Sequence, residues 1–249
     1  MSDALVLSWR QYRLERHMFW RNPSAAFFNF ALPLLFLLAG GVILPGRQHD
    51  LNLLVPAIAG MSVMSTTFTA LAYNIVFLRE RGVLKRIRGT PLPTISYFGG
   101  VAANAVTNTA MQIAIITVAG KLLFGIGWPR DWAELVVFVL AGVVCFAALG
   151  VAFAHAIPNF ESTAAYVNAV FLPVVFVSFY VFDSKSAPAF VRHIAEALPL
   201  KPLIDGLSGA MVTGVGLSSN LSALAVIALW GVFGVYFAVR GFSWEQSRH

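Results

Sequence analysis

Six stretches of this chain contain no Asp, Glu, Lys or Arg and are each long enough to cross a membrane. They cover residues 22–46, 51–78, 89–120, 135–160, 162–182 and 206–239. A helix needs about 20 apolar residues to span the hydrocarbon core. Only 11% of the chain is charged, against about 25% in a soluble domain. Because period-two alternation is absent and helices satisfy their own backbone hydrogen bonds in lipid, we predict an all-α polytopic membrane protein with six transmembrane helices.

The predicted elements form a single transmembrane domain over residues 1–249. Its spans are placed at 23–45, 53–78, 97–120, 135–157, 162–182 and 219–239. Residues 186–216 are predicted to form short extracellular helices before the last span, either interfacial or re-entrant. Pro199 and Pro202 are expected to interrupt any continuous helix there, because proline lacks the backbone N–H donor.

Basic residues predict the orientation. With the N-terminus inside, the inner segments carry eleven Lys and Arg against five acidic residues, and the outer segments carry six of each. The whole net charge of +6 then lies on the inner side, which predicts that both termini are cytoplasmic. Attraction to anionic lipid headgroups explains this basic excess, so no nucleic acid partner is inferred.

Residues 1–22 predict an interfacial helix ahead of the first span. Aromatic and basic side chains fall in neighbouring arcs, which suits the membrane–water boundary. A second apolar sector, formed by Leu7, Leu14 and Met18, is expected to pack on the transmembrane helices. The membrane-interface residues are Trp9, Arg10, Tyr12, Arg13, Trp20 and Arg21.

The chain lacks motifs for chemistry of its own. There is no G-x-x-x-x-G-K-[ST] phosphate loop, no H-E-x-x-H metal motif and no G-x-S-x-G nucleophile motif. Cys145 is the single cysteine. We therefore expect a non-catalytic chain with no catalytic residue, no bound metal and no cofactor.

The most charged segment, residues 79–93, predicts a short amphipathic helix between the second and third spans. Val83, Leu84 and Ile87 share one arc, and Arg81, Lys85 and Arg88 share the adjacent flank. Thr90-Pro91 then ends the helix. A positively charged loop with a purely topological role is the alternative.

This segment resembles the E-R-G-x-L-K-R-x-R-x-T-P-L signature of bacterial ABC-2 type transporter permeases. Val83 departs slightly, because the family often has a small polar residue there. "RNP" at 21–23 and "LPLKPLIDGLSG" at 198–209 are also similar to family segments. The matching residues are Glu80, Arg81, Gly82, Leu84, Lys85, Arg86, Arg88, Thr90, Pro91 and Leu92.

The resemblance implies the membrane subunit of an ATP-driven exporter in the bacterial cytoplasmic membrane. Residues 79–93 would be a coupling helix that contacts a separate ATPase subunit present in two copies. The contact residues implied are Glu80, Arg81, Gly82, Leu84, Lys85, Arg86, Arg88, Thr90 and Pro91. That subunit would bind ATP and Mg, and a second permease chain would complete the exporter, a homodimer being favoured over a heterodimer. A secondary carrier and a membrane-embedded assembly factor without an ATPase are the alternatives.

The sequence identifies neither the substrate nor a substrate-binding residue. A drug or antibiotic, a lipid or a lipid-linked glycan would suit the phenylalanine-rich fifth span, which contains Phe171, Phe176, Phe179 and Phe182. The favoured interpretation is that these side chains face lipid or pack between helices, as in any membrane bundle.

Overall fold

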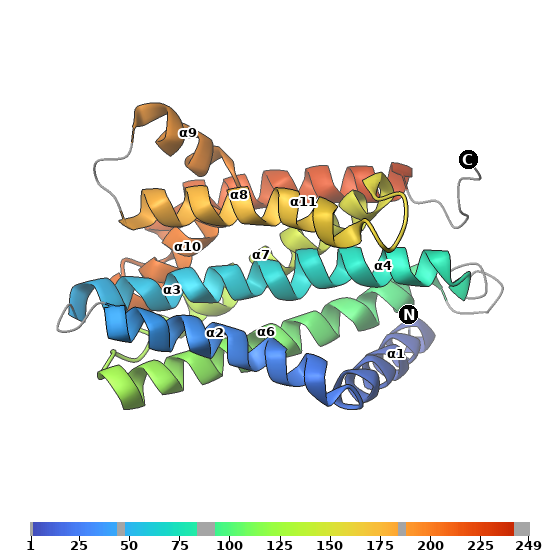
Figure 1. The fold of residues 1–249 in the computed structure, drawn as a ribbon, viewed down its shortest axis with the longest axis horizontal. Helices are drawn as coiled ribbons and strands as arrows, with labels where there is room; N and C mark the ends of the chain where they lie inside the picture. Colours follow the sequence, from blue (N-terminus) through green and yellow to red (C-terminus); the bar gives the residue numbers. More distant parts are fainter. Residues whose placement is uncertain (1, 44–47, 84–92, 184–187, 242–249) are drawn as a thin grey trace.

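The computed structural model describes residues 2–43, 48–83, 93–183 and 188–241. Within these ranges every regular element is a helix and none is a strand, which confirms the predicted all-α class. The long helices run side by side along one axis (Figure 1). Their bounds are α1 Ser2–Trp20, α2 Pro23–Ile43, α3 Gln48–Met64, η1 Ser65–Thr69, α4 Ala70–Glu80, α6 Thr94–Phe124, α7 Trp132–Phe153, η2 Ala154–Ala156, α8 Thr163–Asp183, α9 Ala189–Ala197, α10 Leu200–Ser208, η3 Gly209–Thr213, η4 Leu217–Asn220 and α11 Leu221–Gly241.

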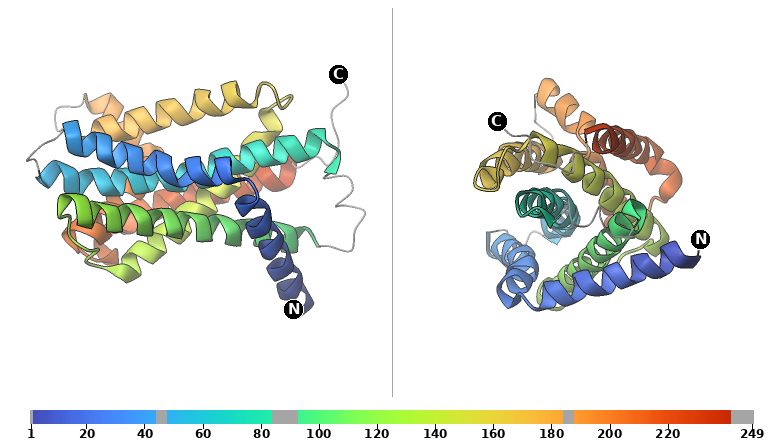
Figure 2. Two further views of the ribbon diagram at one scale, coloured as in Figure 1. Left: turned by 60° about the horizontal axis from the view of Figure 1, so that its bottom comes forward. Right: turned by 90° about the vertical axis from the view of Figure 1, so that its right-hand side faces the viewer.

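Five helical segments among the described residues are long and apolar enough to cross a membrane. They are Ala26–Ile43, Leu51–Glu80, Gly99–Phe124, Trp132–Ala156 and Leu217–Arg240. Thr163–Phe179 of α8 is a shorter apolar segment by the same measure. The sixth predicted span therefore remains a prediction, although α8 lies alongside the other long helices (Figure 2).

The second span forms the centre of the bundle. Of its apolar window, 72% is buried, against 17% for the windows of α2 and α11. Its helix runs from α3 through a π-helical turn, η1, into α4. Gly150 of α7 allows close approach here, since a Cβ at that position would meet the Phe68 carbonyl oxygen at 2.7 Å. Helices α7 and η1 thus pack backbone against backbone.

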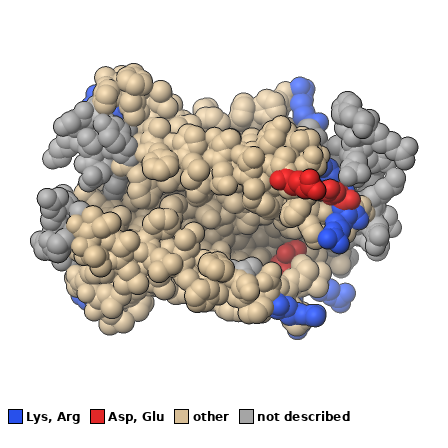
Figure 3. All heavy atoms as spheres, viewed as in Figure 1, with Lys and Arg blue, Asp and Glu red and all other residues tan. Residues whose placement is uncertain are grey.

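On the face that Figure 3 shows, the charged side chains lie near the two ends of the bundle, with a broad band without charge between them. At one end lie α1 and the last residues of α4 and α11, which we call the α1 end. The opposite end carries α9 and α10.

Two expectations about local structure are wrong. Pro202 does not interrupt a helix, because it lies in the first turn of α10, where its missing N–H is not needed. Pro199 does lie between α9 and α10. Leu14 and Met18 do not pack on the bundle, since they are 51% and 47% exposed.

Candidate functional site

The described part of the predicted coupling segment begins as the last turn of α4. Arg79 donates hydrogen bonds to two carbonyl oxygens that follow α7, Ala154 at 3.1 Å and Ile157. These carbonyls lie in and directly after the short η2 turn, where the helical segment that begins with α7 ends. The Arg79 guanidinium therefore ties the end of α4 to the connection between α7 and α8.

Glu80 makes a second tie to the same connection. Its Oε2 accepts a hydrogen bond from the backbone N–H of Phe160 at 2.8 Å. The Phe160 ring lies against Phe77, with ring centroids 5.5 Å apart, and against Tyr73, at 6.3 Å. We call Arg79, Glu80 and their partners Ala154, Ile157 and Phe160 the loop clamp.

The chain leaves α4 through a glycine turn. Gly82 has a φ of +65°, and its N–H donates to the Arg79 carbonyl at 3.1 Å. This left-handed conformation ends a helix and favours glycine over other residues. Arg81 lies over the Phe77 ring at 4.9 Å and is exposed.

The predicted partner contacts lie partly beyond this turn. Glu80, Arg81 and Gly82 are the predicted contact residues that the structure describes. The remaining ones, Leu84, Lys85, Arg86, Arg88, Thr90 and Pro91, lie outside the described residues. Arg79 was missed as a site residue, because its partners are backbone atoms about 75 residues away that leave no sequence pattern.

Helix α1 packs on the bundle through its polar face. Its half-buried residues, Ala4, Leu7, Ser8, Gln11, Tyr12, Glu15, Arg16 and Phe19, recur at helical spacing. Arg16 donates to the side chains of Asn108 and Met111 of α6, and the Ser96 hydroxyl donates to the Ala4 carbonyl.

The opposite face of α1 is exposed and carries aromatic, aliphatic and basic side chains. The predicted interface residues Trp9, Arg10, Arg13, Trp20 and Arg21 are exposed. Their place at the membrane boundary stays a prediction. Tyr12 differs, because it is half-buried and lies 3.4 Å from the Thr107 hydroxyl. Figure 2 shows α1 crossing the end of the bundle at an angle.

Glu15 should make the docking of α1 sensitive to pH. Burial raises its pKa above the ordinary 4.5, against the lowering effect of the Gln11 hydrogen bond. Between these pKa values the folded chain keeps a proton that the unfolded chain has lost, so stability falls as pH rises above about 4.5. We expect Glu15→Gln to raise the unfolding temperature at pH 7, and this gain to shrink towards pH 4.5. Thermal unfolding in detergent at both pH values measures it, and a gain independent of pH would contradict the assignment.

A groove of about 580 Å³ opens between α2 and α8, with α3 and η1 as its floor. Helices α2, α3 and α8 lie at the front of the view in Figure 1. We call it the α2–α8 groove. Its lining is mostly apolar and consists of Phe28, Asn29, Leu32, Pro33, Phe36, Leu54, Ile58, Met61, Ser62, Ser65, Thr69, Gln112, Asn168, Phe171, Leu172, Val175, Phe176 and Phe179.

Several buried polar atoms along this groove have no hydrogen-bond partner among the described residues. They are Asn29 Nδ2, Ser62 Oγ and Thr69 Oγ1. Their neighbour Gln112 is bonded, donating to the Asn29 carbonyl at 2.6 Å and accepting from Thr66 at 2.8 Å. Buried polar groups without partners are costly in a membrane. Because these atoms are themselves buried, a ligand that carries hydroxyl or amide groups could bond to them only when the groove widens.

The segment between α8 and α11 folds back into the bundle. The Trp230 indole, midway along α11, donates to the Ala197 carbonyl at the turn between α9 and α10. A Cβ on Gly60 of α3 would meet Ile204 at 2.7 Å. The turn therefore reaches the middle of α11, which favours the re-entrant alternative over the interfacial one.

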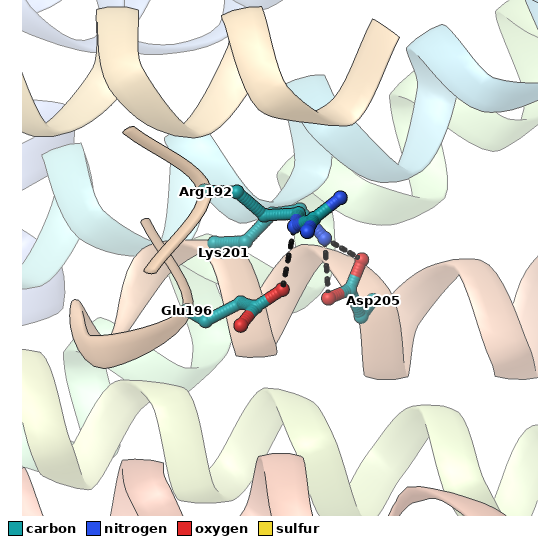
Figure 4. Close-up of polar contacts among 4 residues, drawn as sticks. All are labelled: Arg192, Glu196, Lys201 and Asp205. Atoms are coloured by element: carbon teal, nitrogen blue, oxygen red, sulfur yellow. Dashed lines mark hydrogen bonds and ion pairs between the residues drawn. The ribbon is translucent and has the colours of Figure 1, made fainter. Parts of the chain in front are cut away.

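Helices α9 and α10 each carry an ion pair between residues one turn apart. Arg192 and Glu196 pair on α9 at 3.9 Å, and Lys201 and Asp205 pair on α10 at 2.5 Å (Figure 4). Both members of the α9 pair are about half exposed, whereas the Lys201 side chain is 13% exposed. Pairing lowers the cost of placing such charges between membrane helices.

Comparison with known proteins gives one family and a consistent set of relatives. The model of the ABC-2 type transporter family matches residues 3–212. Nodulation protein J of Rhizobium meliloti (strain 1021) is 25% identical over 90% of this chain and 88% of its own length, and that of Sinorhizobium fredii is 26% identical over 92% and 89%. The linearmycin resistance permease protein LnrN of Bacillus subtilis is 27% identical over 68% of this chain and 46% of its own length.

Proposed function

The chain belongs to the ABC-2 type transporter family, and we propose on that basis that it works as the membrane subunit of an ATP-driven exporter. Family membership and the five candidate spans make it a multi-pass protein of the inner membrane. The cargo of the proposed exporter is an amphipathic or hydrophobic molecule that moves outward.

The energy would come from a separate ATPase subunit, in two copies, that binds ATP and Mg. The sequence has no phosphate-binding loop, and the basic segment 79–93 provides a docking element for that subunit. In the proposed topology six helices cross the membrane and the α1 end faces the cytoplasm. The excess of Lys and Arg at this end supports that orientation. A second permease chain, by preference an identical one, completes the assembly.

The loop clamp is the observation that carries the coupling mechanism. Arg79 and Glu80 stand at the start of the docking segment and bind the connection that leads directly into α8. Helix α8 is also one wall of the α2–α8 groove. A push of the ATPase on the segment would therefore move α8 relative to α2 and change the width of the groove.

The α2–α8 groove is the proposed substrate route. Its aromatic and aliphatic walls suit the apolar part of a cargo, and Asn29, Ser62 and Thr69 supply polar contacts. Since these groups are neutral, an amphipathic cargo with hydroxyl or amide groups fits better than an ion. The name of LnrN, a resistance permease, supports efflux of an antibiotic-like compound.

Reconstitution tests this proposal. The purified chain in liposomes, with its ATPase subunit, should move members of a panel of antibiotics, lipids and glycolipids only when ATP is supplied. Transport that runs on an ion gradient without the ATPase would instead establish the secondary carrier. If the chain transports no compound of the panel, either alone or together with the ATPase subunit and ATP, the assembly factor would be favoured.

A further inference from the structure

Helix α2, one wall of the α2–α8 groove, contains a proline within its length. Pro33 is buried and lines the groove. Because proline has no backbone N–H, the carbonyl of Asn29, four residues earlier, lacks the donor that an α-helix normally gives it. Membrane helices tolerate such a proline where a neighbouring group bonds to the freed carbonyl. Proline is also a common point of helix bending.

Gln112 of α6 supplies that neighbouring donor. Its Nε2 donates to the Asn29 carbonyl oxygen at 2.6 Å, and its side chain is buried, with 3% exposed. The Thr66 hydroxyl, in the π-helical turn η1, donates to the Oε1 of the same amide at 2.8 Å. This second bond directs the NH2 group of the amide towards α2. The amide therefore joins the backbone of α2 to α6 and to the central span.

The two halves of α2 are held to the bundle in different ways. After Pro33 the helix packs closely, since a Cβ on Gly40 or Gly41 would come within 2.1 Å of a neighbouring side chain. Before Pro33 the helix is more open, and Phe28 is 65% exposed. Besides ring contacts with the end of α1, this first half is tied to α6 by the Gln112 bond. Helix α2 lies at the edge of the bundle (Figure 2), so its first half has room to swing outward.

We propose that Gln112 is a positioning residue that sets the width of the α2–α8 groove. The groove opens when α2 bends at Pro33 and the bond from Gln112 to the Asn29 carbonyl breaks. Bending uncovers this pair of groups beside two buried polar atoms without partners, Asn29 Nδ2 and Ser62 Oγ. Hydroxyl or amide groups of a cargo then replace the broken bond. This inference rests on the proposed substrate route and adds how its α2 wall is held.

Thiol labelling measures how often the groove opens, and it needs neither the ATPase nor a cargo. Cys145→Ala removes the single native cysteine, and Ser65→Cys then places a thiol on the floor of the groove. The rate of its reaction with N-ethylmaleimide is measured on the purified full chain. Gln112→Met removes both bonds of the amide and should raise this rate about ten-fold, because the closed groove is left with an unpaired buried carbonyl.

Thr109→Val is the matched control for Gln112→Met. Thr109 is also buried on α6, but its hydroxyl has no hydrogen-bond partner among the described residues. Its loss should therefore leave the labelling rate unchanged.

Pro33→Ala separates the proposed role from a local packing effect. It returns a backbone N–H to α2, so the Asn29 carbonyl no longer needs Gln112. In a Pro33→Ala chain, Gln112→Met should therefore leave the labelling rate unchanged. A similar increase with and without Pro33, or no increase in the chain that keeps Pro33, would overturn the proposal.

Thermal unfolding is measured for each variant. If Gln112→Met does not fold, Thr66→Val supplies the test, because it removes the bond that directs the Gln112 amide. It should give a smaller increase in the labelling rate, which Pro33→Ala also abolishes; an increase that persists in Pro33→Ala would overturn the proposal. A failure of the proposed function is seen separately, since a chain that transports no compound would leave these labelling rates as they are.

Discussion

Arg79→Met is expected to uncouple ATP hydrolysis from transport while the ATPase subunit stays bound. The substitution removes two charge-assisted hydrogen bonds, to Ala154 and Ile157, and keeps a side chain of similar length. Each such bond contributes roughly 1.5–3 kcal/mol, so the clamped arrangement should lose at least about 3 kcal/mol. That corresponds to a shift of roughly 100-fold between clamped and released states. Transport and ATP hydrolysis are measured together in liposomes.

The matched control is Arg240→Met on α11. Arg240 also lies at the α1 end and over an aromatic ring, 4.7 Å from that of Tyr236, but it has no part in the loop clamp. It should leave both activities unchanged. If Arg79→Met transported as well as Arg240→Met does, the loop clamp would have no role in coupling.

Filling the α2–α8 groove should stop transport and leave the ATPase bound. Ser65 lies in the π-helical turn at the floor of the groove, and Ser65→Trp would place an indole in the space that the cargo needs. Overpacking also costs stability, so the unfolding temperature must be measured beside transport.

Ser222→Trp serves as the control for this prediction, because Ser222 is exposed on α11 and does not line the α2–α8 groove. The proposed route requires that Ser65→Trp fold, bind the ATPase and fail to transport. A folded Ser65→Trp protein with normal transport would place the route elsewhere.

The helices could be predicted because charge marks the limits of a membrane span. The central α3–α4 helix ends at Glu80, close to the first charges of the 79–93 segment. The π-helical turn at Ser65–Thr69 could not be foreseen, since it depends on packing against the glycine face of α7. The helix break predicted at Pro202 is absent, because the first turn of a helix does not need the N–H that proline lacks.

The docking face of α1 was predicted correctly for Leu7, which is half-buried, and wrongly for Leu14 and Met18, which are exposed. A helical wheel assumes that apolar residues face the protein, whereas beside a membrane Leu14 and Met18 can remain outside. The polar partners of α1 on α6, such as Asn108, lie in a stretch that reads only as a span. Which face of α1 packs on the bundle therefore depends on whether the other face meets lipid or water.

The candidate site was only partly visible in the sequence. The charged segment and its signature stood out, and Phe171, Phe176 and Phe179 were recognised as one possible cargo surface, which the α2–α8 groove now contains. Ser62 and Thr69 could not be recognised as site residues from the sequence, because isolated hydroxyl side chains are common in membrane helices. Their relevance appears only when the fold leaves them unpartnered beside a groove.

The central claim is that residues 79–93 bind a separate ATPase, and co-purification tests it most directly. The tagged chain and its cognate ATPase are expressed together, and the ATPase recovered is compared between the natural chain and Arg81→Glu. Arg81 is exposed and lies outside the loop clamp, so its reversal should not disturb the fold. We predict that the natural chain retains the ATPase, and that Arg81→Glu loses both the ATPase and ATP-dependent transport. An Arg81→Glu chain that retains the ATPase and transports normally would contradict this account.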